Sequence, residues 1–337
     1  MENNSKAKIS VIILLFLIFG IAINYLPYMS GEGSTEKSWQ LEDTLTEPIS
    51  NVYDVDFSPD SQYLAASSYE KVYIYNADDF SYNRNLSAPS YVHTIKFSPD
   101  SQYLAFSGSI SDYVWIYNTT DWSDIGFTPS STSTTRTNTF SNDGNYFGYG
   151  SSDKYYIHNV SNWNLLQTID LNKATDTSML SSTFSPDSQY LAFISVSKNA
   201  TGSYSDEEVY IYNTSDWSQI INLTEISDVE WYPGVSFSPD GDYLAYGSGD
   251  NKVYVHNTTD WSLITSFSNA SDNSIKGVSF SPDGDYLAYG SGDNKVYVHN
   301  TTDWSLITSF SNASDNSIKG VSFSPDGDYL AYGSGDN

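Results

Sequence analysis

The chain has 337 residues, no cysteine, and 41 acidic residues against 14 basic residues, which gives a formal net charge of −27 at pH 7. Without cysteine there is no disulfide framework, no thiolate metal site and no cysteine nucleophile. A surface this acidic repels phosphate, so we expect no nucleic acid partner. We interpret the charge as favouring solubility, with cation binding as the alternative.

The N-terminal part differs in composition from the rest. Residues 9–29 are mostly apolar and follow Lys6 and Lys8. About 20 apolar residues just span a hydrocarbon core, and a basic flank stays on the inner side. We therefore predict a transmembrane helix at 9–29 in a cell membrane, with residues 1–8 cytoplasmic, 30–37 a linker and the remainder outside. A signal segment is the alternative, and its cleavage would make the protein secreted.

A repeat of 43 residues organises the C-terminal part. Gly234–Lys276 is followed by an identical copy, Gly277–Lys319, and by a third copy that stops at Asn337. In the first copy, alternating and β-branched segments predict four short antiparallel strands separated by Gly, Pro, Asn and Asp turns. The strands are expected at 235–237, 243–246, 252–256 and 262–267. Repeats of this length with four strands are typical of a propeller.

Weaker copies fill the chain upstream. The signature Phe-Ser-Pro-Asp, or its variant Phe-Ser-Asn-Asp, starts at Phe57, Phe97, Phe140, Phe184, Phe237, Phe280 and Phe323. A Tyr-Leu-Ala second strand follows most of them, and the third strand ends in Tyr-Asn or His-Asn. On these motifs the chain resembles the WD-repeat, or WD-like, β-propeller family over 38–337, although the family's Trp-Asp pair is replaced throughout.

The resemblance implies an all-β fold, a seven-bladed ring of four-stranded antiparallel blades, and the N-terminal composition adds the helix that precedes it. Trp39–Leu45 fits the fourth strand of a blade, which can pair with the last blade and close the ring. Because the last unit stops before its third strand, we expect that blade to be incomplete in this chain. We interpret the chain as a truncated reading of a longer protein.

An acidic residue precedes the expected third strand in each unit, and these turns share one face of a propeller. That face is a candidate for binding, with simple turn capping as the alternative. The fourth unit carries about 10 extra residues within Ser195–Glu208, and insertions in repeat folds often mark the binding face. The candidate residues are Glu70, Asp112, Asp153, Lys198, Tyr204, Asp206, Glu207, Asp250, Asp293 and Asp336.

Two recurrent residue types have both a functional and a structural interpretation. Asn-x-Ser/Thr sequons recur, and four that end a third strand are possible glycosylation sites: Asn118, Asn213, Asn257 and Asn300. Asparagine is also a common turn former. Tryptophan recurs after Asp or Asn at a fixed position in the repeat, where packing between blades is favoured over stacking on sugars.

No catalytic set, phosphate loop or metal-binding histidine pair is visible, so we expect no cofactor and no bound metal. The sequence indicates a non-catalytic extracytoplasmic scaffold that binds a protein or surface glycan. The alternative is a propeller enzyme, lactonase-like or quinoprotein-like, with its site at the central channel.

Overall fold

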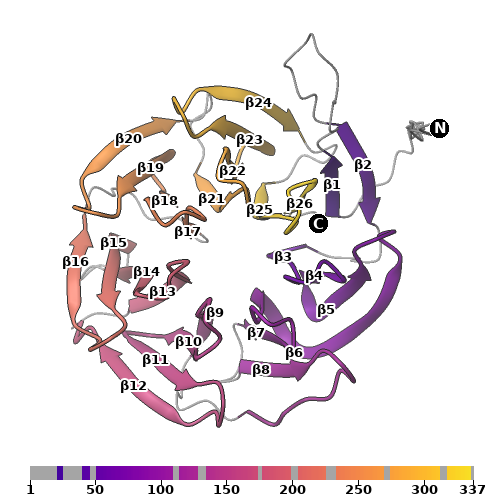
Figure 1. Cartoon of the computed structure of the whole chain (residues 1–337), viewed down its shortest axis with the longest axis horizontal. Helices are drawn as coiled ribbons and strands as arrows, with labels where there is room; N and C mark the ends of the chain where they lie inside the picture. Colours follow the sequence, from indigo (N-terminus) through magenta and orange to yellow (C-terminus); the bar gives the residue numbers. More distant parts are fainter. Residues whose placement is uncertain are drawn as a thin grey trace, which may run out of the picture.

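The structure is a computed structural model. It describes residues 21–25, 40–45, 51–108, 114–127, 134–173, 177–198, 204–224, 233–268, 274–311 and 317–334; for 21–25, 40–43, 198 and 204–206 only the backbone is considered. All strand pairs are antiparallel, and the sheets stand side by side around a central axis (Figure 1).

Four of the sheets are formed by consecutive strands. The first contains β9 (Thr135–Phe140), β10 (Tyr146–Ser151), β11 (Lys154–Asn159) and β12 (Leu165–Asp170). The second contains β13 (Thr177–Phe184), β14 (Tyr190–Lys198), β15 (Tyr204–Asn213) and β16 (Gln219–Leu223). The identical repeats give β17 (Val235–Phe237), β18 (Tyr243–Gly247), β19 (Lys252–Asn257) and β20 (Leu263–Ser268), and then β21 (Ile275–Phe280), β22 (Tyr286–Ser291), β23 (Lys295–Asn300) and β24 (Leu306–Ser311).

A further sheet has six strands. It contains β3 (Val55–Phe57), β4 (Tyr63–Ser67), β5 (Tyr69–Asn76), β6 (Tyr82–Phe97), β7 (Tyr103–Gly108) and β8 (Val114–Asn118). β6 is one strand of 16 residues, whose first part pairs with β5 and whose last part pairs with β7. Between the first and second units the polar segment that separates other repeats is short. The backbone of β6 therefore passes directly from the outer strand of one unit to the inner strand of the next.

The expectation of seven four-stranded blades is therefore wrong. In the described residues the chain forms five four-stranded blades and the six-stranded sheet. The sequence motifs gave the number of repeats, but the continuity of β6 joins two of them into one sheet.

The fifth four-stranded blade joins segments from the two ends of the sequence. Its order is β2 (Gln40–Leu45), β1 (Ile21–Tyr25), β26 (Tyr329–Ser334) and β25 (Ile318–Phe323). The expectation of an incomplete last blade is wrong, because β1 pairs with β26 on one side and with β2 on the other (Figure 1). We expected Trp39–Leu45 to be the fourth strand of the last blade. This is confirmed, because β2 lies at the edge of that sheet.

The predicted N-terminal helix is also wrong where it can be examined. Ile21–Tyr25 is a β-strand, and the described residues contain no helix. Accordingly, no helix among them is long and apolar enough to cross a membrane. The rest of the apolar stretch, 9–20 and 26–29, lies outside the described residues.

One turn explains why each repeat folds as it does. In β17–β18 the Ser238 hydroxyl donates to Asp240 Oδ1 at 2.5 Å and accepts the N–H of Tyr243 at 2.9 Å. Asp240 Oδ1 also accepts the N–H of Asp242 at 3.0 Å, and Gly241 adopts a positive φ of 80°. This network satisfies the polar groups of the turn and reverses the chain.

The hydrophobic core lies between neighbouring sheets. Ile194 and Ile211 of one sheet pack with Phe237 and Tyr246 of the next. Tryptophan completes these contacts. Trp261, 9 % exposed, meets the ring of Tyr190 in the preceding sheet edge to face at 5.4 Å. The packing interpretation of the recurrent tryptophan is thus confirmed.

Candidate functional site: the central channel

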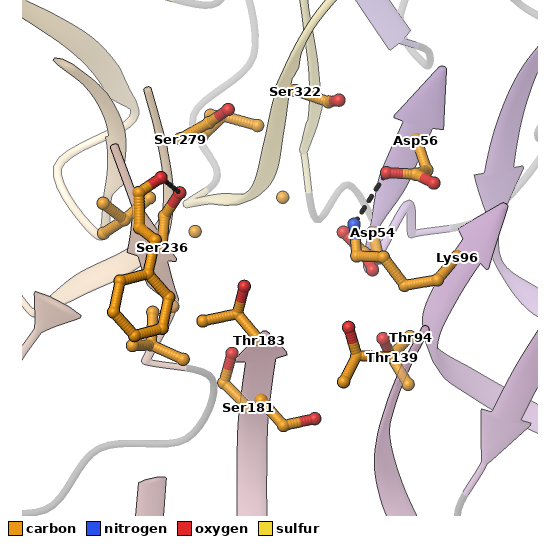
Figure 2. A pocket seen from close by; sticks show the side chains of 18 of the residues that line it. Asp54, Asp56, Thr94, Lys96, Thr139, Ser181, Thr183, Ser236, Ser279 and Ser322 are labelled. Carbon is orange, nitrogen blue, oxygen red and sulfur yellow. Dashed lines mark hydrogen bonds and ion pairs between the residues drawn. The ribbon is translucent and has the colours of Figure 1, made fainter. Parts of the chain in front are cut away.

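The inner strands enclose a cavity of about 600 Å³ on the axis of the ring. Strands from every sheet contribute to it: β3, β6, β9, β13, β17, β21 and β25. The lining is mostly hydroxyl groups, glycine and aromatic residues, with a few charged side chains on one side (Figure 2). The cavity is the candidate functional site.

A series of hydroxyl side chains surrounds the channel at the position just before the signature phenylalanine. Its members are Thr139, Thr183, Ser236, Ser279 and Ser322 (Figure 2). Each hydroxyl lies 3.3–3.4 Å from the carbonyl oxygen of the next residue, to which it donates. These hydroxyls are thus bonded to the backbone and are not paired with a histidine or carboxylate that would activate them as nucleophiles.

In the six-stranded sheet, charged residues replace these hydroxyls. Asp56 and Lys96 occupy the equivalent positions, and Lys96 Nζ donates to Asp56 Oδ1 at 2.7 Å (Figure 2). Asp56 Oδ2 also accepts the N–H of Phe97 at 2.8 Å. Asp54 lies two residues earlier, and its carboxylate accepts the N–H groups of Val55 and Ile95 at 2.9 and 3.1 Å.

The environment of these groups shifts their pKa values. Burial raises the pKa of Asp54 to about 6; Lys96 opposes this rise and the negative charge of Asp56 adds to it. Burial alone would lower the pKa of Lys96, but the carboxylates of Asp56 and Asp54 outweigh it and raise the pKa above its ordinary value. The lysine therefore stays charged and neutralises part of this carboxylate pair.

Glycine allows the inner strands of the last three sheets to approach closely. A Cβ on Gly277 would lie 2.7 Å from the carbonyl oxygen of Lys319, and a Cβ on Gly234 would lie 2.5 Å from the backbone nitrogen of Val278. A Cβ on Gly320 would likewise lie 2.7 Å from the Cα of Asp54. Asp54 thus occupies the position that glycine holds in these repeats, which brings its carboxylate to the edge of the channel.

The predicted binding face stays a prediction, and its described residues lie in different local environments. Glu70 is exposed at a positive φ of 59°, and Asp153 is half-buried. Asp250 Oδ2 accepts the hydroxyl of Tyr254 at 2.7 Å, and Asp293 Oδ2 accepts that of Tyr297 at 2.6 Å. Asp112 and Asp336 lie outside the described residues.

The predicted insertion loop of the fourth unit is largely strand. β14 and β15 have 9 and 10 residues, and they contain Lys198, Tyr204 and Asp206. Glu207 lies inside β15 opposite Val196, and only 3 % of it is exposed. Its pKa is raised to about 8, mainly by burial and in smaller part by the negative charge of Asp250, while the Gly249 backbone opposes the rise. Glu207 is therefore a buried group of the sheet interface and does not present its carboxylate on an open face.

The described residues were also compared with the groupings that bind metal ions. Within the described ranges, no three His, Asp or Glu residues are grouped so that they could hold a metal ion.

The four sequon asparagines end their third strands as predicted. Each is half-buried, and its Oδ1 accepts the N–H two residues later: Thr120 for Asn118, Ser215 for Asn213, Thr259 for Asn257 and Thr302 for Asn300, at 2.7–2.8 Å. The turn-forming role is thus present, and glycosylation stays a prediction.

The sequence analysis did not find Asp54, Asp56 and Lys96. A signal for them was available. At the positions one and three residues before the signature phenylalanine, other repeats carry Ser, Thr or Gly, whereas these units carry charged residues. The departure from the repeat pattern at these inner-strand positions is thus the sequence signal of the charged group.

The comparisons with protein families agree with the architecture. The model described as "Anaphase-promoting complex subunit 4 WD40 domain" matches residues 235–316 and 278–337. The model described as "WD domain, G-beta repeat" matches residues 39–76 and 80–118. Together the matched segments cover more than half of the chain. No curated protein matches it.

Proposed function

Because the chain belongs to the WD-repeat β-propeller family, we propose that it is a non-catalytic scaffold that binds a partner protein on one face of its ring. WD40 propellers generally serve as protein-interaction scaffolds. The observation that carries the proposal is the channel itself. In its described lining, five hydroxyl groups donate to backbone carbonyl oxygens, and Asp56 and Lys96 pair with each other.

A ring has two faces, one where the inner strands begin and one where they end. The face where the inner strands begin is the better candidate for the binding site of the partner. The turns between second and third strands lie at this same end, because the second strand runs back antiparallel to the first. Tyr69 is 44 % exposed at the start of β5, and it meets the ring of Tyr91 at 4.8 Å. Exposed tyrosine is common in protein interfaces, since it offers apolar area and a hydroxyl.

We place this activity outside the cell membrane, on the basis of the N-terminal composition. Lys6 and Lys8 precede an apolar stretch, which is the arrangement of an anchor or signal segment. Ile21–Tyr25 cannot both pair with β26 and lie in a lipid bilayer. Residues 9–20 alone are shorter than the ~20 residues needed to span a bilayer, a length closer to a signal-segment core. Mass spectrometry of the mature N-terminus in its own cells tests this, and an intact Met1 in the cytoplasmic fraction would refute it.

Site-specific photo-crosslinking tests the scaffold function. A photoreactive phenylalanine analogue at Tyr69 reports on the proposed face, and the same analogue at Leu165 is the control. Leu165 is 45 % exposed and starts the outer strand β12 at the opposite end of its sheet. We expect one partner protein to be cross-linked from Tyr69, and to be displaced by excess unlabelled chain. Equal cross-linking from both positions, or none that saturates, would contradict the proposal.

A further inference from the structure

β1 takes the place that the third strand of the repeat takes in other blades. β22 and β26 have the same sequence, Tyr-Leu-Ala-Tyr-Gly-Ser, in two copies of the repeat. On β22, Gly290 lies opposite Val296 of β23. On β26, the equivalent Gly333 lies opposite Ile21 of β1, and the pairing continues residue by residue without a shift. β1 is therefore in third-strand register, although it comes from the other end of the sequence (Figure 1).

The residues of β1 match this position only in part. In register, β23 supplies Val-Tyr-Val-His-Asn at 296–300, and β1 supplies Ile-Ala-Ile-Asn-Tyr at 21–25. The apolar first and third residues agree. The second and fourth do not, because Tyr and His of the repeat are replaced by Ala and Asn, which have no aromatic ring.

In the complete blade, these two rings pack on the second strand. The ring centre of Tyr289 lies 5.2 Å from that of Tyr297 and 5.5 Å from that of His299, and both pairs are stacked. His299 Nδ1 donates to the carbonyl of Trp304 at 2.9 Å, so its Nε2 accepts the hydroxyl of Tyr289 at 3.3 Å. Aromatic pairs of this kind stabilise a sheet beyond the area that they bury.

The same arrangement occurs in the other identical repeat. Tyr246 stacks on Tyr254 and on His256, with ring centres 5.5 Å apart in both pairs. The equivalent tyrosine of β26 is Tyr332, which lies opposite Ala22. A strand with Tyr and His at these two positions would therefore complement β26 better than β1 does.

A hairpin fits this position better than a single strand. β23 is followed by β24 through a turn that contains Trp304, and the ring of Trp304 meets Tyr243 of the preceding sheet edge to face at 5.3 Å. Tyr286 is the equivalent residue of the sheet that precedes the last blade. A hairpin with an Asp-Trp turn would thus contact β26 and the neighbouring sheet together.

We propose that β26 is an acceptor for a β-hairpin of a partner protein, and that this hairpin displaces β1 and β2 and completes the blade by strand addition. The partner's hairpin has the pattern of the repeat: an apolar-Tyr-apolar-His-Asn strand, an Asp-Trp turn and an outer strand. The inference goes beyond the proposed scaffold function, because the acceptor lies within one blade and does not require binding at Tyr69.

Competition with the chain itself decides where such a hairpin binds. β1 belongs to the same chain, so an added hairpin competes with a strand at high effective concentration. Exchange with β19–β20 or β23–β24 would replace a hairpin by one of the same pattern, and it gains no contact. Exchange with β1–β2 gains two stacked rings and a tryptophan. The acceptor is therefore β26 rather than β18 or β22.

Two peptides test the residue pattern. The probe is a fluorescein-labelled peptide with the sequence of Lys295–Ser311, and the control is the same peptide with Tyr297→Ala and His299→Asn, which are the residues of β1 at these positions. Fluorescence anisotropy with the full chain gives each Kd. We expect the probe to bind at least about 10-fold more tightly than the control. Equal affinities, or no binding of the probe, would overturn the proposal.

A disulfide tests whether β1 must leave. The chain has no cysteine, and Ile23 lies opposite Ala331 in the β1–β26 pair. Residues directly opposite in antiparallel strands are close enough for a disulfide. Ile23→Cys with Ala331→Cys should bind the probe when reduced and lose affinity at least about 10-fold when oxidised. Unchanged affinity after oxidation would show that the probe does not displace β1, and the proposal would be wrong.

The identical repeats supply the matched control. Ala288 lies opposite Val298 in the β22–β23 pair, which is the same register position. Oxidation of Ala288→Cys with Val298→Cys should change the affinity for the probe less than about 2-fold, because β23 is not the strand that is displaced. A loss as large as that of the β1–β26 disulfide would mean that the probe exchanges with an internal hairpin, which would overturn the assignment to β26.

Discussion

Lys96 Nζ lies 2.7 Å from Asp56 Oδ1 and joins β6 to β3 inside the channel, although 40 positions separate the two residues in the sequence. The other repeats have a hydroxyl residue at this position and need no such pair. The ion pair therefore fastens the two inner segments of the six-stranded sheet to each other. It also keeps Asp54 and Asp56 from facing each other without a counter-charge.

Removing the cation should destabilise this sheet. Lys96→Met keeps most of the side-chain volume but leaves two carboxylates without their lysine, and we expect a loss of about 2–3 kcal/mol at pH 7. Urea unfolding measures it. Asp56→Asn combined with Lys96→Met should recover part of the loss, because the double variant removes one of the uncompensated charges. A single Lys96→Met variant as stable as the wild type would contradict this account.

Glu207 should make stability fall as the pH rises. Its pKa is about 8 in the folded chain against an ordinary 4.5, so between these values the unfolded chain releases a proton that the folded chain retains. The loss of unfolding free energy caused by Glu207 therefore grows from about pH 4.5 to pH 8, where it is on the order of 2–4 kcal/mol. Glu207→Gln should flatten this dependence and be more stable than the wild type at pH 8. Unfolding free energies measured from pH 5 to 9 test it.

The neighbouring Glu208 should behave in the opposite way. Burial alone would raise its pKa, but hydrogen bonds from Lys173 and Tyr210 outweigh burial and lower it. Its stabilising contribution is present above the unfolded pKa and is lost as the pH falls through the folded pKa. Glu208→Gln should thus cost ~1–2 kcal/mol at pH 7 and little at acidic pH. If both variants changed stability in the same direction at pH 8, the assignment of the two environments would be wrong.

Gly277 should tolerate no side chain. A Cβ there would lie 2.7 Å from the carbonyl oxygen of Lys319 and 2.9 Å from the nitrogen of Val321, both in the neighbouring inner strand. Because backbone atoms cannot move aside cheaply, Gly277→Ala should cost about 2–4 kcal/mol. Ser279→Ala, two residues later and facing the channel, is the control and should cost less than about 1 kcal/mol. Thermal unfolding of both variants distinguishes these values.

Trp261 should be a structural residue. It is 9 % exposed, contacts Tyr190 of the preceding sheet and accepts a hydrogen bond from His256 Nδ1 to its carbonyl at 2.9 Å. Trp261→Ala removes the ring and should cost ~3–5 kcal/mol. Leu263→Ala is the control, because Leu263 is 44 % exposed, and it should stay within about 0.5 kcal/mol of the wild type. Similar losses in both variants would contradict the packing role.

The repeat motifs predicted the strands well, because each strand is short, alternating and bounded by strong turn residues. Val235–Phe237, for example, forms β17 at the bounds expected from its pattern. The motifs could not predict that β6 would run without a break, since this depends on the geometry between two sheets. Nor could they predict β1, because an apolar segment of this kind has the composition of a membrane helix as much as of a buried strand.

The candidate site was less predictable than the fold. The acidic residues before the third strands were visible in the sequence, but the hydroxyl groups of Tyr254 and Tyr297 that engage Asp250 and Asp293 come from the next strand. The pairing of Asp56 with Lys96 was not visible, because it depends on which inner segments become neighbours around the channel.

The sheet that joins β1 to β26 has a mechanical consequence. Ile21 pairs with Gly333 and Tyr25 with Tyr329, so the start of β1 lies beside the end of β26. A force that separates Ile21 from Gly333 loads the hydrogen bonds of this pair one after another rather than together. The ring should therefore open like a zipper at low force at this seam. Formation of the same contacts, which close the longest loop in the fold, should be the last event when the chain refolds.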